Sequence, residues 1–195
     1  MSLNVLVIPE DFRKDQYVLA PLVSKMFAEI GKPQARVRVC TDPLLGGVAE
    51  ALDWGRIRDI IEMYPMVNLF LLIVDRDGKP GRRQSLTRIE GLANEGLAAG
   101  RALFGENAWQ EIEVWALAGQ DLPQGWKWKA VQAEVDPKEK YFEPFARRRN
   151  LLDEPGEGRT TLGREAAQNY QRVRDRCQRD IQHLESRLKE WLADK

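Results

Sequence analysis

The stretch VNLFLLIVDRDG, residues 67–78, begins with the most apolar run of the chain and ends abruptly in charged residues. A short, continuous apolar run bounded by turn residues is typical of a strand buried on both faces of a parallel sheet. We therefore expect residues 67–74 to form the central strand of an α/β domain. Asp75 and Asp77 then lie in the loop at the carboxyl end of this strand, and Gly78 lets the chain turn there.

Similar patterns extend the sheet on both sides of this stretch. Residues 3–8 (LNVLVI) and 35–40 (ARVRVC) predict two further strands, and residues 111–117 (EIEVWAL) alternate in the manner of a fourth. The helices expected between the strands are residues 17–30, 48–63 and 84–104. Strands that alternate with helices indicate a mostly parallel, doubly wound, Rossmann-like sheet.

The C-terminal part of the chain has a different pattern. A short helix is expected at residues 137–149, and a segment rich in Pro, Gly and Glu follows it. Apolar residues then recur at steps of four and three, which predicts one long helix. We expect an α/β domain at residues 1–150, a linker at 151–159, and a helix at 160–195 that packs on the body or on a partner.

Composition excludes several classes of function. Lys plus Arg and Asp plus Glu each number 30, so no overall positive field gathers nucleic acid, and phosphate binding requires local patches. The chain has one histidine, His183, which excludes zinc sites built from several His and Cys residues. The two cysteines form no CxxC pair, and no apolar run is long enough for a membrane span, so we expect a cytoplasmic protein with reduced thiols.

Three carboxylates are expected to meet at one edge of the sheet. Glu10 follows the first strand, and Asp75 and Asp77 follow the central strand; if these strands are neighbours, the three side chains converge. Carboxylates this close repel one another and raise each other's pKa values unless a cation holds them ionised, and oxygen ligands without His or Cys suit Mg²⁺ or Mn²⁺. Strand-end acids also serve as helix caps or solvated loop residues, and this alternative stays open.

Two segments resemble the signature segments of the TOPRIM domain, which occurs in topoisomerases, primases and nucleases of the overcoming-lysogenization-defect type. They are VLVIPED (residues 5–11) and FLLIVDRDG (residues 70–78). The resemblance implies that Glu10 acts as general acid or base and that Asp75 and Asp77 bind Mg²⁺. Asp11 follows Glu10 where many relatives have Glu-Gly, so either acid of this pair can face the metal.

The chain resembles still more closely small bacterial TOPRIM-like proteins that are often encoded beside ATPases. EIEVWALA (residues 111–118) and DPKEKY (residues 136–141) are similar to their later motifs, so that the resemblance covers residues 3–142. It implies a further functional acid, Glu113, as a metal ligand; the alternative is a solvated glutamate on an edge strand. Lys79 stands where a DxDxD motif would have its third acid, unlike a topoisomerase arrangement.

Basic residues follow the DxD motif directly. Lys79, Arg82 and Arg83 are expected at the same edge of the sheet, where they can clamp phosphates. These features together predict a Mg²⁺-dependent TOPRIM-type nuclease that acts on nucleic-acid phosphodiesters, with DNA favoured, and the resemblance adds an ATPase partner in defence against foreign DNA. The alternative is a non-catalytic subunit that keeps the fold and binds a partner protein. A homo-oligomer is left open.

Overall fold

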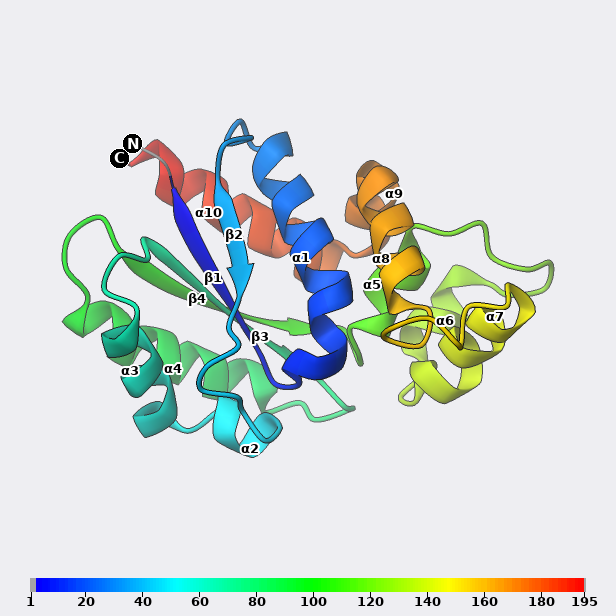
Figure 1. Ribbon diagram of the computed structural model, residues 1–195, viewed down its shortest axis with the longest axis horizontal. Coiled ribbons are helices and arrows are strands. Elements are labelled where there is room, and N and C mark those ends of the chain that lie inside the picture. The colour runs from blue at the N-terminus through cyan, green and yellow to red at the C-terminus, as the bar shows by residue number, and fades with distance from the viewer. Residues whose placement is uncertain (1–2, 195) are drawn as a thin grey trace.

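The computed structural model describes residues 3–194. Within them, four parallel strands form one sheet in the order β2-β1-β3-β4 (Figure 1). Their bounds are β1 (Asn4–Pro9), β2 (Arg36–Val39), β3 (Leu69–Asp75) and β4 (Ala102–Ala108). The expected α/β class and parallel sheet are therefore confirmed, and β3 lies inside the sheet, between β1 and β4.

The two faces of the sheet carry separate hydrophobic cores, because alternate residues of a strand point in opposite directions. One face packs against α1 (Phe12–Glu29) and the C-terminal helices, and the other packs against α3 (Trp54–Met63) and α4 (Arg82–Gly96) (Figure 1). The strand residues in the first core include Val5, Val7, Leu69, Leu71 and Ile73. Those in the second include Leu6, Ile8, Phe70, Leu72 and Val74.

The direction in which the chain leaves each strand creates a crevice at the carboxyl edge. After β1 the chain enters α1 on one face, whereas after β2 and β3 it enters α2 (Val48–Ala51), α3 and α4 on the other face. The loop after β1 therefore diverges from the loops after its two neighbours in the sheet, β2 and β3. Ligands of open parallel sheets bind in crevices of this kind.

The sequence prediction is wrong for β4 and for residues 111–117, and the helix expected at residues 48–63 is divided into α2 and α3. The helix expected at residues 84–104 ends at Gly96, and part of it is the strand β4; the strand expected at residues 111–117 is a helix, α5 (Glu113–Ala118). All six residues of α5 are buried, so the segment has no polar face from which a helical period could be read. β4 (ALFGENA) contains Gly and polar residues, and its pairing with β3 decides its structure.

The long C-terminal helix is not found as one piece. The chain forms α8 (Arg159–Gln168), α9 (Tyr170–Arg176), a π-helical turn η2 (Gln178–Gln182) and α10 (His183–Ala193). The buried Asp180 explains the second break: its carboxylate accepts the backbone N–H of Trp109 at 2.8 Å and the indole N–H of Trp115. The chain bends there so that α10 runs along the sheet (Figure 1).

The remaining segment lies between α5 and α8. It contains α6 (Trp128–Ala133), a π-helical turn η1 (Lys138–Phe142) and α7 (Glu143–Arg148), the last two within the helix expected at residues 137–149. α8 packs on α1 and α5, and its buried residues belong to the same core as the sheet. Among the described residues, none of the helices is long and apolar enough to cross a membrane.

Candidate functional site

The first two acids predicted from the sequence meet at the crevice. Glu10 follows β1 directly, Asp75 is the last residue of β3, and these strands are neighbours. The backbone N–H of Asp75 donates to Oε2 of Glu10 at 3.2 Å. Asp11 instead caps α1 by accepting the N–H of Arg13 at 3.0 Å, and it is exposed. Glu10 is therefore the acid of the pair that turns toward the end of β3.

The loop after β3 is held by the loop before α5. The backbone oxygen of Gln110 accepts the N–H groups of Arg76 and Asp77 at 2.9 and 3.1 Å, and its side-chain oxygen accepts that of Gly78 at 2.9 Å. Oδ1 of Asp75 accepts the N–H of Ile112 at 2.9 Å, so one carboxylate oxygen also anchors the start of α5. These bonds fix the DxDG loop independently of any ligand.

The third acid, Asp77, lies farther out. Its φ of 49° places it in the left-handed region, which Asp tolerates better than most residues. Arg82 donates from Nη2 to Oδ2 of Asp77 at 2.8 Å and from Nε to the backbone oxygen of Asp75 at 3.1 Å. A guanidinium therefore already compensates part of the negative charge at this edge of the sheet.

A second layer of acids lies behind Glu10 and Asp75. Asp15 on α1 is 7% exposed and accepts the N–H of Asp11 at 3.3 Å. The sequence analysis missed it, although a signal was present: Asp15 precedes the buried Val18 and Leu22 of the apolar stripe of α1 by three and seven residues. An acid on the buried stripe of a helix marks either a polar core or a site.

Glu113 does not lie on a strand face as expected. It is the first residue of α5, is 5% exposed, and forms an ion pair with Arg159, which is 2% exposed. Nη1 of Arg159 also donates to the backbone oxygen of Gly156 at 3.0 Å, whereas its buried Nε has no hydrogen-bond partner. The first residue of α8 thus supplies a cation to the acidic cluster, and this residue was not predicted from the sequence.

The two acids at the crevice hold protons more tightly than usual. Burial raises the pKa of Glu10 to about 7, although the hydrogen bond from the N–H of Asp75 lowers it, and the charge of Asp77 adds to the rise. Burial raises the pKa of Asp75 well above its ordinary value, and the charges of Glu113 and Glu10 add to it. The ionised forms of both groups therefore need a compensating positive charge.

The acids behind them behave in the same way. Burial and the charge of Glu113 raise the pKa of Asp15 to about 8. Burial and the same neighbour raise the pKa of Glu111 to about 7, although Glu111 accepts the N–H of Lys138 at 2.9 Å. Titratable groups with raised pKa values that converge in a crevice are a common signature of functional sites.

The predicted phosphate-binding residues occupy different environments. Lys79 is exposed in the loop after β3, and Arg82 is bonded to Asp77 as described. Arg83 forms an ion pair with the fully buried Glu106 of β4 and donates to the backbone oxygen of Gly105 at 3.1 Å. Lys79 is thus the most accessible of the three, and the phosphate-binding role of all three stays a prediction.

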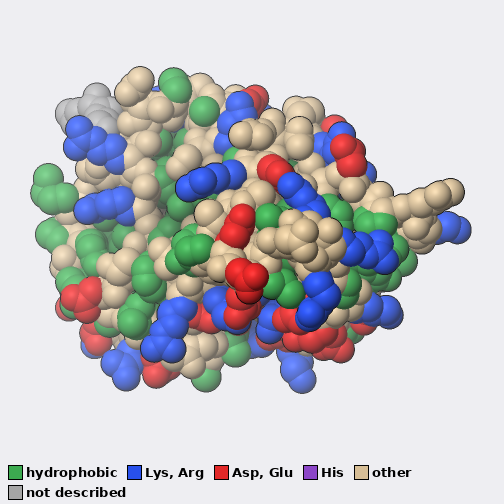
Figure 2. Space-filling model, turned by 45° about the vertical axis from the view of Figure 1, so that its right-hand side comes forward, with side chains coloured by type: hydrophobic (Ala, Val, Ile, Leu, Met, Phe, Trp, Pro, Cys, Tyr) green, Lys and Arg blue, Asp and Glu red, His purple; other side chains and the backbone are tan. Residues whose placement is uncertain are grey.

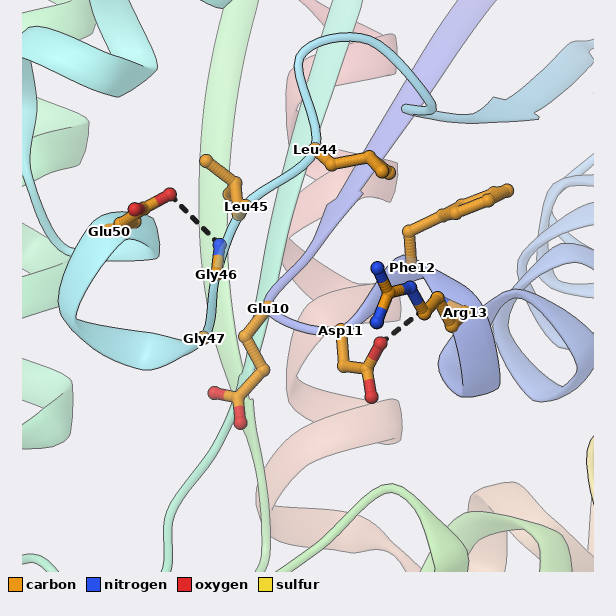
Figure 3. A pocket seen from close by; sticks show the side chains of 9 residues that line it. All are labelled: Glu10, Asp11, Phe12, Arg13, Leu44, Leu45, Gly46, Gly47 and Glu50. Carbon is orange, nitrogen blue, oxygen red and sulfur yellow. Dashed lines mark hydrogen bonds between the residues drawn. The ribbon is translucent and has the colours of Figure 1, made fainter.

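An open pocket of about 450 Å³ adjoins Glu10 (Figure 3). It lies between the β1–α1 loop and the β2–α2 loop, and its lining residues are Glu10–Arg13, Leu44–Gly47 and Glu50. In Figure 3 the Glu10 side chain extends away from Leu44 and Phe12, so the pocket has an apolar side and an acidic side. Figure 2 shows acidic and basic side chains interspersed over the face it presents, in keeping with the zero net charge.

No protein-family model, curated protein or solved structure matches the chain. Among residues 3–194, no group of three or more His, Cys, Asp or Glu side chains is arranged so that it could hold a metal ion. The observed arrangement is therefore a hydrogen-bonded pair, Glu10 and Asp75, with Asp77 bound to Arg82 beside it.

Proposed function

We propose that the chain is a Mg²⁺- or Mn²⁺-dependent nuclease of the TOPRIM type that hydrolyses phosphodiesters at the carboxyl edge of its sheet. The observation that carries the proposal is the contact between Glu10 and the N–H of Asp75, on adjacent strands at the crevice. It brings together the acids of VLVIPED and FLLIVDRDG, the two segments that resemble the TOPRIM signatures. If these acids lay at different edges of the sheet, they could not form one catalytic site.

The donor set suits a hard divalent cation by its chemistry, although such a cation would have to draw the three carboxylates together, because in residues 3–194 they do not form a metal-binding group. Glu10, Asp75 and Asp77 offer carboxylate oxygens, and no histidine or cysteine lies among the residues that line the pocket at Glu10. A bound cation would supply positive charge to a phosphodiester and stabilise the oxygen atoms that attack and leave. Arg82 would then release Asp77 to the cation and bind the substrate through Nη2, while its Nε can keep the hydrogen bond to the backbone oxygen of Asp75.

The residues of the chain have distinct tasks in this scheme. Burial raises the pKa of Glu10 to about 7 in the metal-free protein, and a bound cation would lower it, so that ionised Glu10 would accept a proton from an attacking water molecule and return it to the leaving oxygen. Arg82 and Lys79 would bind the phosphates that flank the scissile bond. Arg159 offsets part of the charge of Glu113, and the charge that remains effective raises the pKa of Asp75. Because Glu113 is paired with Arg159, it would support the site instead of binding the cation.

Cleavage assays with labelled single- and double-stranded DNA and RNA test the proposal. The wild type should cleave at least one of these substrates in Mn²⁺, and Asp75→Asn should abolish cleavage. Glu62→Gln, which alters a glutamate whose side chain is 70% exposed on α3, is the matched control and should cleave like the wild type. The proposal fails if the wild type shows no metal-dependent cleavage or if Asp75→Asn cleaves equally well.

One observation favours the second candidate, a non-catalytic TOPRIM-fold subunit that binds a partner protein. Asp77 and Glu113 are both neutralised by arginines of the same chain, and Asp75 anchors α5, so each acid has a structural task. Divalent-metal binding discriminates between the candidates, because a purely structural cluster has no need of a cation. The ATPase partner, the preference for DNA and a homo-oligomer rest on the resemblance and stay proposals.

A further inference from the structure

The pocket beside Glu10 has features that the proposed hydrolysis does not use. It opens where the chain leaves β1 toward one face of the sheet and β2 toward the other, so the two loops part. Its volume of about 450 Å³ lies within the range of about 300–1,000 Å³ that is typical of small-molecule sites. The hydrolysis of a phosphodiester needs only the acidic side of this space.

The opposite side of the pocket is apolar. Leu44 is 49% exposed, which is unusual for a leucine among the described residues, and its side chain extends toward Phe12 (Figure 3). Leu45 also lines the pocket, but its side chain extends away from Leu44 and packs against the second core (Figure 3). The aromatic ring of Phe12 and the exposed Leu44 form a surface on which a planar, weakly polar group can stack.

The floor of the pocket leaves backbone accessible. Gly47 has a φ of 111°, which side-chain-bearing residues rarely adopt, and a Cβ built on it meets nothing within 4 Å. The N–H of Gly46 is bonded to Glu50 at 2.9 Å, which holds the loop in shape. At Gly47 the loop therefore borders open space, which permits the close approach of a ligand, whereas the space at Gly46 is taken by the Glu50 carboxylate.

The charges around the pocket select the kind of ligand. Three carboxylates, Glu10, Asp11 and Glu50, and one cation, Arg13, lie among the lining residues, and each carboxylate accepts a backbone N–H group. A free anion is therefore disfavoured in the apolar part. A neutral ring suits the apolar side, and a phosphate attached to it would lie at the Glu10 edge, where the cation of the proposed function would offset the carboxylate charge.

We propose that this pocket binds one unstacked nucleobase of a single-stranded nucleic acid, stacked on Phe12 and Leu44, while the adjoining phosphate lies at the Glu10 edge. The inference deepens the proposed function and rests on it for the position of the phosphate. Bases in a duplex are paired and stacked, so turning one out costs the free energy of unpairing and unstacking, and a single strand has no base pair to break. Because the protein has no net charge to gather a duplex, base stacking gives the single strand the advantage.

Fluorescence anisotropy tests the inference with labelled oligothymidylate, its duplex with oligoadenylate, and an abasic strand of the same length, each in Ca²⁺ to slow hydrolysis. Phe12→Ala should weaken binding of the single strand by about tenfold, within the range known for base–aromatic stacking. Leu44→Ala should weaken it less. Met66→Ala, which truncates a side chain that is 79% exposed at the opposite end of the strands, is the matched control.

The abasic strand should bind weakly to the wild type and equally to Phe12→Ala, because it has no base to stack. The inference is overturned if the wild type does not bind oligothymidylate, if both variants bind it as the wild type does, or if the abasic strand binds as tightly as the intact one. Should Phe12→Ala fail to fold, as thermal melting would reveal, Leu44→Ala decides, since its side chain is half exposed.

The outcomes also separate this inference from the proposed function. Binding that depends on Phe12, without cleavage of oligothymidylate or any other substrate in Mn²⁺, supports the base pocket and refutes the nuclease. Metal-dependent cleavage with binding that Phe12→Ala and Leu44→Ala leave unchanged supports the nuclease and refutes the base pocket.

Discussion

Replacing Glu10 by glutamine removes one negative charge and keeps the shape of the side chain, so it isolates the electrostatic cost of this acid. Burial raises the pKa of Glu10 in the folded protein to about 7 from an ordinary value of 4.5. The ionised carboxylate is therefore less stable in the fold than in the unfolded chain. The amide oxygen of glutamine can still accept the N–H of Asp75, so the hydrogen bond is not lost.

The sign of the effect follows from proton linkage. Because the pKa is raised in the fold, the contribution of Glu10 to stability is present below pH 4.5 and is lost as the pH rises through about 7. The difference between about 7 and 4.5, at 1.36 kcal/mol for each pKa unit, gives about 3 kcal/mol at pH 8. Glu10→Gln avoids this loss and should melt about 6–12 °C higher than the wild type at pH 8, with little difference at pH 4.

Thermal melting of the metal-free proteins at pH 4 and pH 8 measures the effect. Glu62→Gln, on the exposed surface of α3, is the control and should show no pH-dependent gain. Added Mn²⁺ should stabilise the wild type more than Glu10→Gln, because the cation compensates the charge that the variant lacks. A Glu10→Gln protein that melts below the wild type at pH 8, or that gains equally at both pH values, would refute the placement of Glu10 in an acidic cluster.

Three further predictions concern the supporting structure. Asp75→Asn should weaken Mn²⁺ binding by at least about tenfold, the loss that follows removal of even an outer-shell partner, and calorimetry that gives equal affinities contradicts it. Arg159→Met should cost about 3–5 kcal/mol in urea unfolding because it leaves Glu113 buried and unpaired, and Arg159→Met with Glu113→Leu should restore most of the loss. In Gly163→Ala the new Cβ would collide with the backbone of α1, which should lower the free energy of unfolding by about 1–3 kcal/mol. Gly91→Ala on α4 meets no neighbouring atom and should raise the free energy of unfolding by about 0.5–1 kcal/mol. Equal effects of the two variants would disprove the packing of α8 on α1.

The sequence predicts the part of the fold in which local pattern and burial agree. β1 and β3 are continuous apolar runs, so both their existence and their burial are visible, and the convergence of Glu10 with Asp75 follows once the strands are adjacent. β2 alternates between exposed and half-buried residues, as an edge strand does. In these segments the local preference and the tertiary structure favour the same conformation.

Prediction fails where tertiary contacts override the local pattern. α5 is buried on all sides, so its sequence has no polar face to reveal a helix, and its alternation of Glu with aliphatic residues mimics a strand. The breaks at Asn169 and Cys177 interrupt an apolar stripe that continues with nearly helical spacing from one helix to the next. The stripe shows which residues are buried but does not show where the helix axis bends.

The second layer of the site was hidden for a similar reason. Arg159 lies in a segment that is rich in Gly and charged residues and has the composition of a linker, yet it is buried against Glu113. Only the packing of α8 on α1 and α5 brings the two residues together. Asp15, in contrast, had a visible signal in its position on the buried stripe of α1.

Calorimetric titration of the metal-free protein with Mn²⁺ near pH 6.5, in two buffers of different ionisation enthalpy and with and without oligothymidylate, tests the central claim most directly. Because burial raises the pKa of Glu10 to about 7 and that of Asp75 well above its ordinary value, a cation that binds to them should displace protons. We predict saturable binding with proton release, and less proton release in Glu10→Gln. The absence of divalent binding at millimolar metal, both with and without the strand, would contradict the assignment of this edge as a metal-dependent site.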